Sequence, residues 1–397
     1  MLITHLFLIQ VHSQTKQTSS GRKRAREYGI RIGVLPTGTH NAITDVQGVK
    51  VGHVTLHIGN SIRTGVTAIS PHDGNIFQQK VPAAVYVGNG FGKLSGSTQV
   101  TELGNLETPI ILTNTLSVGT AMEATVQYTV DQAGNEKVQS VNAVIGETND
   151  GYLNDIRGRH VNKAHVLEAI QKATHGPVQE GNVGAGTGTV CFGFKGGIGT
   201  SSRMLPQAVG GYTVGVLVQT NFGGVLQIAG APVGERLDQY YLSPQLKKEK
   251  ESRKAPGDSK SQNTKKTEDA DGSCMIIVAT DAPLDARNLE RLAKRAMFGL
   301  AKTGGIAANG SGDYVIAFST DPALRIPYEP SQPTQTVTLL HNDYMSSLFM
   351  AVIEATEEAI INSMTKAETT TGKEQHVIEA LPMDKVVKIL KEYNRLE

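Results

Sequence analysis

The feature that most constrains the fold is an abrupt change of composition about two-thirds of the way along the chain. Residues 243–272 are dominated by Lys, Glu, Arg, Ser and Gly, and such a segment cannot bury a core. The apolar run 274–279 follows at once and is typical of a strand buried on both faces. Gly272 and Ser273 stand at the junction. We therefore expect a charged, solvated linker over residues 243–272 and a buried strand directly after it.

The rest of the chain alternates between strand-like and helix-like segments. Short apolar runs between turn residues predict strands within 30–68 and at 83–87, 109–114, 141–145, 212–218 and 314–319. Apolar spacing predicts helices over 118–130 (a stripe of Val118, Met122, Val126 and Val130), 166–173, 289–300, 345–364 and 386–390. Repeated blocks of this kind predict an α/β layered sandwich. Residues 29–242 and 273–397 are then two parts of one domain.

The N-terminal head, residues 1–28, is expected to be disordered or removed. Its first 14 residues resemble a short export signal but lack a positively charged start. An exported protein (periplasmic or extracellular) and a cytoplasmic one both remain open. The basic cluster at residues 21–26 is interpreted as a solvated tail.

The bulk numbers and the remaining motifs exclude several kinds of protein. A net charge of +1 gives no reason to expect a nucleic-acid partner, and no apolar run approaches the ~20 residues of a membrane span. Cys191 and Cys274 are interpreted as small core residues. The glycines at 184–188 lack the third glycine of a dinucleotide loop, and His53 and His57 lack the Glu of a zinc-protease helix. No metal and no organic cofactor are expected.

Ser273 is a candidate nucleophile because of its place at the junction. A serine hydroxyl needs a base to take its proton, and an N-terminal serine can use its own α-amine, whose pKa is near 8. That chemistry requires the chain to be cut before the serine. Gly272 lowers the steric cost of the strained geometry in which the Ser273 hydroxyl attacks the preceding carbonyl.

Five motifs occur in order along the chain, at residues 112–115, 146–155, 218–223, 271–284 and 309–320. Together they resemble the L-aminopeptidase/D-esterase family (peptidase family S58), which includes β-peptidyl aminopeptidases. The resemblance covers roughly residues 29–379. It implies a four-layer α/β/β/α sandwich, similar in layering to N-terminal nucleophile hydrolases but differently connected. It also implies self-cleavage between Gly272 and Ser273 into two chains that stay together, and a homo-oligomer of these processed pairs.

The resemblance assigns roles residue by residue. Ser273 would be the nucleophile, and Ser311 and Asp313 would hold and polarise its hydroxyl and amine. Some family members carry Glu in place of Asp313, which is one methylene shorter. Asn221 would donate to the oxyanion, and Tyr152 would assist at the oxyanion or the leaving group.

An aminopeptidase must also recognise the ammonium group of its substrate, and a carboxylate suits that task. Glu147 and Asp150 both lie in the matching motif, and the choice between them stays open. The expected activity is removal of N-terminal residues from short peptides, amides or esters through an acyl-enzyme on Ser273. Two alternatives are an acyltransferase to amines of the ornithine acetyltransferase type and an unprocessed, non-catalytic homologue.

Overall fold

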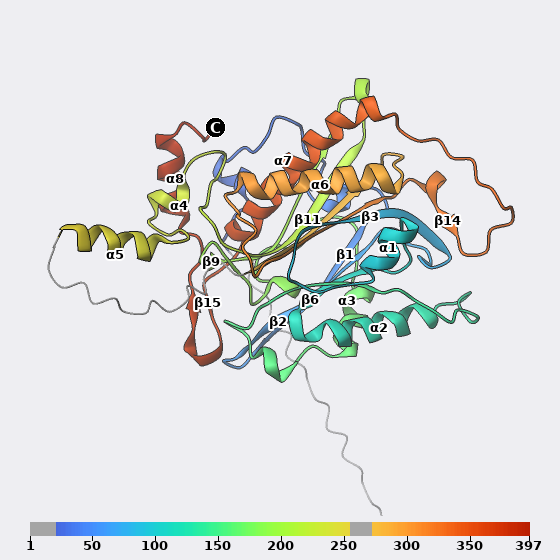
Figure 1. Ribbon diagram of the computed structural model, residues 1–397, viewed down its shortest axis with the longest axis horizontal. Coiled ribbons are helices and arrows are strands. Elements are labelled where there is room, and N and C mark those ends of the chain that lie inside the picture. The colour runs from blue at the N-terminus through green and yellow to red at the C-terminus, as the bar shows by residue number, and fades with distance from the viewer. Residues whose placement is uncertain (1–20, 255–271) are drawn as a thin grey trace, which may run out of the picture.

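The computed structural model describes residues 21–254 and 272–397, and in this part of the chain two β-sheets lie face to face between two layers of helices (Figure 1). The helices α6 and α7 cover one sheet, and α2 and α3 cover the other. The expected four-layer α/β/β/α sandwich is therefore confirmed.

The larger sheet carries the junction. Its strands are, in spatial order, β10 (Gly197–Met204), β11 (Thr213–Asn221), β12 (Ser273–Thr280), β13 (Gly312–Ser319), β3 (Gln79–Gly90) and β14 (Ile326–Pro327), and β5 (Asn105–Leu106) also pairs with β3. The β12 strand runs antiparallel to β11 and parallel to β13. It therefore lies inside the sheet with a neighbour on each side, which explains its uninterrupted apolar sequence.

The smaller sheet has the order β1 (Lys50–Ile58), β2 (Ile62–Ser70), β6 (Ile110–Asn114), β7 (Val144–Thr148) and β4 (Leu94–Ser95). Two short hairpins lie outside these sheets: β8 (Val190–Cys191) with β9 (Phe194–Lys195), and β15 (Thr370–Thr371) with β16 (Val377–Ile378). The α-helices are α1 (Ser97–Leu103), α2 (Val118–Val130), α3 (Lys163–Gln171), α4 (Val233–Arg236), α5 (Ser243–Lys254), α6 (Ala286–Lys302), α7 (Met345–Thr365) and α8 (Met383–Glu392). No helix of the described residues is long and apolar enough to span a membrane.

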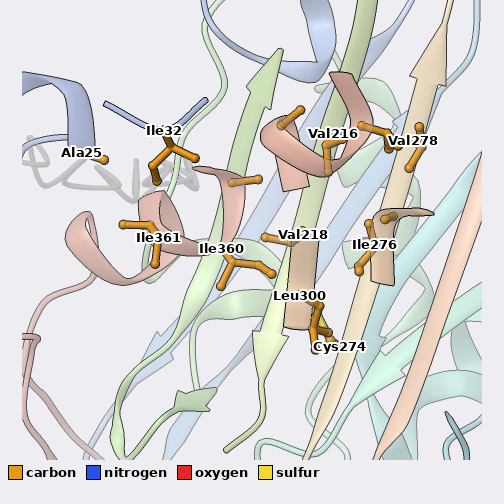
Figure 2. Packing of buried hydrophobic residues seen from close by; sticks show 14 of the residues in the cluster. Ala25, Ile32, Val216, Val218, Cys274, Ile276, Val278, Leu300, Ile360 and Ile361 are labelled. Carbon is orange, nitrogen blue, oxygen red and sulfur yellow. The ribbon is translucent and has the colours of Figure 1, made fainter. Parts of the chain in front are cut away.

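Alternate residues of β12 fill two different cores. Met275 and Ile277 pack between the two sheets. Cys274, Ile276 and Val278 face the other way, toward α6 and α7 (Figure 2). This alternation fixes the direction of every side chain at the start of the strand: Ser273 lies on the face between the sheets, and Cys274 lies on the helix side. Both cysteines are fully buried, as expected for small core residues.

The predicted helices exist, but the buried face of one differs from the prediction. In α6 the apolar stripe faces the core, and the Asp285 side chain caps the first turn by accepting from the Asn288 N–H at 2.9 Å. In α2 the buried residues are Ala121, Ala124, Thr125 and Thr129, whereas Met122 is exposed. Small residues face the sheet there because they allow a close approach. Of the expected stripe, Val118 and Val126 pack at the edge of this core, and the prediction was wrong for Met122.

The head is ordered from Gly21 onward, which contradicts the expected solvated tail at residues 21–26. Ala25 is fully buried, and Arg26 binds the buried Glu358 at 2.8 Å. Arg24 similarly binds Glu180 at 2.7 Å. A basic cluster indicates a solvated segment only when no buried carboxylates lie opposite it. Here Glu180 and Glu358 are two such carboxylates. The signal-like stretch at residues 1–14 lies outside the described residues.

The charged linker also differs from expectation at its start. Residues Ser243–Lys254 form α5, whose charged side chains from Lys247 to Arg253 are exposed and include an Arg253–Glu249 pair four residues apart. The described part is thus solvated, as its composition predicts, but it is helical. Residues 255–271, the remainder of the predicted linker, lie outside the described part of the chain.

Candidate active site

The candidate nucleophile is the first residue of a central strand. Ser273 begins β12 and pairs with Asn221 at the end of β11 and with Gly312 at the start of β13. Because β12 is hydrogen-bonded on both sides, the position of Ser273 is set by the sheet rather than by a loop. Ser273 and Asn221 are only 6% and 7% exposed, so the site is largely shielded from water.

A single backbone N–H contacts both partners of the expected cleavage. Gly312 N donates to the Ser273 Oγ at 3.1 Å and to the Gly272 carbonyl oxygen at 3.2 Å. A donor at the carbonyl polarises it toward nucleophilic attack. Sequence reasoning did not identify this role of Gly312, because a backbone donor leaves no trace in residue type.

Two glycines permit this close packing. A Cβ atom at Gly272 would lie 1.9 Å from the Asn221 carbonyl oxygen, and one at Gly312 would lie 2.5 Å from the Cα atom of Gly92. Neither glycine has a left-handed backbone, so glycine is required here for space. The expected role of Gly272 was to lower the steric cost of attack on its carbonyl, and the nearby Asn221 carbonyl oxygen is a steric reason for glycine at this position.

Asn221 is held with its amide donor available. Its side chain lies on the same face of the sheet as Ser273, because Leu217 of the same strand packs between the sheets. Val190 N donates to the Asn221 Oδ1 at 2.9 Å, and in the described part of the chain the Nδ2 group makes no hydrogen bond. The side chain can therefore donate to an oxyanion formed beside Ser273.

Ser311 and Asp313 lie at the same end of the sheet and are both 1% exposed. Within the described residues, the Ser311 hydroxyl and both carboxylate oxygens of Asp313 lack a partner at hydrogen-bond geometry. Burial raises the pKa of Asp313 to about 6, while the nearby Ser311 hydroxyl and the Cys274 N–H act in the opposite direction. Unpartnered buried polar atoms are costly, so a further hydrogen-bond donor at this end of the sheet would be stabilised by these groups.

The Asp313 side chain does not lie on the same face of the sheet as the Ser273 side chain. Asp313 pairs with Cys274 across the parallel ladder and so lies on the helix side of the sheet, opposite to the Ser273 side chain. The Asp313 side chain therefore lies near the N-terminal end of the β12 backbone, on the face opposite to the Ser273 hydroxyl. The expected contact between Asp313 and that hydroxyl is not formed.

The two candidate carboxylates for substrate binding occupy different surroundings. Glu147 accepts from Lys93 N at 3.0 Å and from the Thr115 hydroxyl. A Cβ atom at Gly92 would lie 3.2 Å from the Glu147 Oε1 and 2.9 Å from the Cα atom of Gly312, so this carboxylate is close to the Ser273 end of the sheet.

Asp150 is instead part of an interior network. It accepts from the Asn154 amide at 2.9 Å, and burial raises its pKa to about 7. Neither Asp150 nor Glu147 lines the cavity beside Asn221, so the two residues differ in their hydrogen-bond partners and in the closeness of Glu147 to Gly92 and Gly312. The geometry thus separates the two residues that the sequence left equivalent.

A cavity of about 700 Å³ opens beside Asn221. Its lining combines the loop after β7, the end of β11, the hairpin β8–β9, the segment before α5 and the hairpin β15–β16: Asn149, Gly151, Tyr152, Val190, Phe192, Gly193, Asn221, Phe222, Gly223, Gly224, residues 238–245, Lys247 and Ile378. Tyr152 lies in this wall and is 51% exposed. Its ring stacks on His376, with centroids 4.4 Å apart, so a residue far along the sequence fixes its place.

Comparisons with known proteins agree with this geometry. A family model described as peptidase family S58 matches residues 41–378. The chain is 42% identical over 391 residues to the beta-peptidyl aminopeptidase BapA of Sphingosinicella microcystinivorans, covering 94% of this chain and 93% of that protein.

Two solved structures are similar throughout. A beta-aminopeptidase from Burkholderia sp. superposes with a TM-score of 0.81 and 40% identity, covering 93% of this chain and 99% of that one. The L-aminopeptidase D-Ala-esterase/amidase from Ochrobactrum anthropi superposes with a TM-score of 0.82 and 36% identity, covering 94% and 99%. That protein is described as a prototype for the serine aminopeptidases and as a new variant of the Ntn hydrolase fold.

Proposed function

The chain belongs to peptidase family S58, and we propose that it is a self-processing serine aminopeptidase that becomes active when the Gly272–Ser273 bond is cleaved. The observation that carries this proposal is the position of Ser273. It lies between Asn221 and Gly312 at a strand end where the buried polar groups of Ser311 and Asp313 lack partners.

Self-cleavage begins with attack of the Ser273 Oγ on the Gly272 carbonyl carbon. The Gly312 N–H polarises that carbonyl, and the C–N bond breaks as the proton of the hydroxyl passes to the departing nitrogen of Ser273. The product is an ester between Gly272 and Ser273. Water then hydrolyses this ester, which releases the Gly272 carboxylate and leaves Ser273 with a free α-amine.

The unpartnered Ser311 hydroxyl and Asp313 carboxylate support a role for the new α-amine of Ser273. As an ammonium ion it donates hydrogen bonds to the Ser311 hydroxyl oxygen and the Asp313 carboxylate, and as a free base it takes the proton of the Ser273 hydroxyl. The hydroxyl then attacks the substrate carbonyl to form an acyl-enzyme, and the leaving amine takes the proton. The Asn221 amide stabilises the oxyanion, a contribution of roughly 3 kcal/mol in comparable sites.

Glu147 is the better candidate for the substrate ammonium. It lies beside Gly92, which contacts Gly312, whereas Asp150 is held in the interior with Asn154. A carboxylate near Ser273 restricts the enzyme to substrates with a free N-terminal amine, which defines an aminopeptidase. The similar proteins are named for both L-amino and β-amino substrates, so short peptides and amides of either kind are the proposed substrates.

The family match favours hydrolysis over the acyltransferase alternative. We further propose that processed pairs assemble into a homo-oligomer, as the family resemblance implies. Light scattering on the purified, cut protein tests this point, and a mass equal to one cut chain would contradict it.

The test of the function compares two substrates that differ only at the amine. A dipeptide amide with a free N-terminus should be hydrolysed, and its N-acetylated form should not. The Ser273→Ala variant should remain uncut and inactive while its circular dichroism matches the wild type. A cut or active Ser273→Ala protein would contradict the proposal.

A further inference from the structure

The hairpin β15–β16 is fastened to the loop that carries Tyr152. Lys373 N donates to the Leu153 carbonyl oxygen at 2.8 Å, and the Arg63 Nε donates to the Thr371 carbonyl oxygen at 2.8 Å. Gly372 lies so close that a Cβ atom there would be 2.1 Å from the Leu153 oxygen. The hairpin is therefore docked at residues 371–373 by two hydrogen bonds and a close backbone approach.

His376 of this hairpin holds Tyr152 in two ways. The rings stack with centroids 4.4 Å apart and planes 13° from parallel, and the His376 Nδ1 donates to the Tyr152 carbonyl oxygen at 2.9 Å. Since a carbonyl only accepts, the histidine carries a proton on Nδ1. Tyr152 is half exposed, so burial alone does not fix its ring, and His376 supplies the missing constraint.

Backbone strain precedes this histidine. Glu374 and Gln375 both have positive φ, at 55° and 62°, although neither is a glycine. Such a conformation is unfavourable for a residue with a Cβ atom and persists where the surroundings require it, often at ligand sites. Here the strained turn delivers His376 to Tyr152 and brings Ile378 into the cavity wall.

The cavity is rich in aromatic side chains, and its wall includes Asn221, which pairs with Ser273 across the ladder. The aromatic residues in its lining are Tyr152, Phe192, Phe222, Tyr240 and Tyr241, and Ile378 adds an aliphatic side chain. Glu147 and Gly92 are not among its lining residues. The carboxylate proposed for the substrate ammonium therefore lies outside this cavity, whose wall includes Asn221, the ladder partner of Ser273.

A substrate must then extend across Ser273. With its ammonium at Glu147 and its carbonyl at Ser273, the part beyond the scissile bond is directed toward the cavity at Asn221. We propose that the aromatic-walled cavity is the subsite for the leaving-group residue, that it takes an aromatic or large apolar amine, and that His376 is a positioning residue for Tyr152 in its wall. This inference rests on the proposed aminopeptidase function.

The kinetic test uses two dipeptide amides with the same N-terminal residue, one ending in phenylalaninamide and the other in glycinamide. The wild-type kcat/KM should favour the phenylalaninamide substrate by about tenfold or more, as expected for a filled apolar pocket. His376→Ala should remove most of that preference through KM, whereas His376→Phe, which keeps a stacking ring, should retain it. Equal losses on both substrates, or no preference in the wild type, would overturn the proposal.

A matched pair in β16 tests the cavity without turnover. Ile378 lines the cavity, while its neighbour Val377 is 46% exposed and absent from the lining. In the Ser273→Ala background, calorimetric binding of phenylalaninamide should be lost in Ile378→Glu and kept in Val377→Glu.

The two proposals fail differently. Binding that is lost only in Ile378→Glu supports the subsite even if the cut wild-type protein hydrolyses neither amide, a result that would contradict the proposed function alone. Absent binding, or equal binding by both variants, would overturn the subsite even if hydrolysis is found.

Discussion

Asn221 and Ser273 are direct partners at the open end of the antiparallel ladder between β11 and β12. Their side chains share the face between the sheets, so the proposed oxyanion donor and the proposed nucleophile are positioned by the same ladder. Cutting the chain before Ser273 leaves that ladder and the one with β13 in place. The proposed cleavage therefore creates a new amine without requiring the hydroxyl to move away from Asn221.

Replacing Asn221 should impair turnover more than binding. Asn221→Ala removes the free amide donor, and loss of one oxyanion donor lowers kcat by about 10²–10³-fold. Steady-state kinetics should show this loss with KM changed far less. Asn162→Ala is a matched control, because Asn162 caps α3 and its loss should lower stability by about 1 kcal/mol while kcat is unchanged. A fall mainly in KM for Asn221→Ala would contradict the assigned role.

Replacing Gly272 should slow self-cleavage for a steric reason. A Cβ atom at this position would lie 1.9 Å from the Asn221 oxygen, so Gly272→Ala must displace the scissile carbonyl from the Gly312 N–H. We expect the cut to slow by at least about tenfold, since catalysis depends steeply on such alignment. A time course of the two fragments on a denaturing gel measures it. Gly119→Ala is the control, because Gly119 has nothing within 4 Å and lies in α2, where alanine should be neutral or stabilising. Cleavage at the wild-type rate in Gly272→Ala would contradict the account.

Asp313 should give the uncut protein a specific pH dependence. Its pKa is raised by burial from 3.8 to about 6, so the folded state holds this proton more tightly than the unfolded state does. The contribution to stability is therefore lost as the pH rises through this interval, up to about 3 kcal/mol. In the Ser273→Ala background, adding Asp313→Asn should remove that loss. Thermal unfolding at a series of pH values compares the two proteins, and parallel curves across the interval would contradict the burial of an unpaired carboxyl.

Substitutions of Glu147 and Asp150 should affect different properties, namely substrate binding for Glu147 and stability for Asp150. Glu147→Gln removes the charge proposed to bind the substrate ammonium, and we expect KM to rise by about tenfold or more. Asp150→Asn changes an interior network with Asn154 and should alter stability with little effect on KM. Kinetics and thermal unfolding of both variants check this, and a larger KM effect in Asp150→Asn would reverse the assignment.

The larger elements could be predicted from the sequence because their burial is simple. The β12 strand is buried at every position and apolar from Cys274 to Ala279 since both of its faces are covered, and α6 shows one apolar stripe against the sheet. The buried face of α2 was not predicted by the spacing of its large apolar residues, since Ala121 and Ala124 face the sheet and Met122 faces outward. Close packing of small residues is not visible in hydrophobic spacing alone.

The candidate site was predictable only in part. Motifs pointed to Ser273 and Asn221 and left Glu147 and Asp150 as alternatives, but the shared donor at Gly312 is a backbone N–H, whose role the residue type does not reveal. His376 contacts Tyr152 although the two are more than 200 residues apart in the sequence, and no local sequence pattern predicts such a contact. Only the packed fold brings these groups together.

The most direct test of the central claim is N-terminal sequencing of the smaller fragment of the purified protein, together with its intact mass. The account predicts two fragments, with the smaller one beginning Ser273-Cys274-Met275, and one uncut chain for Ser273→Ala. A single intact wild-type chain that still hydrolyses peptide amides, or a cut at any other bond in the active protein, would contradict it.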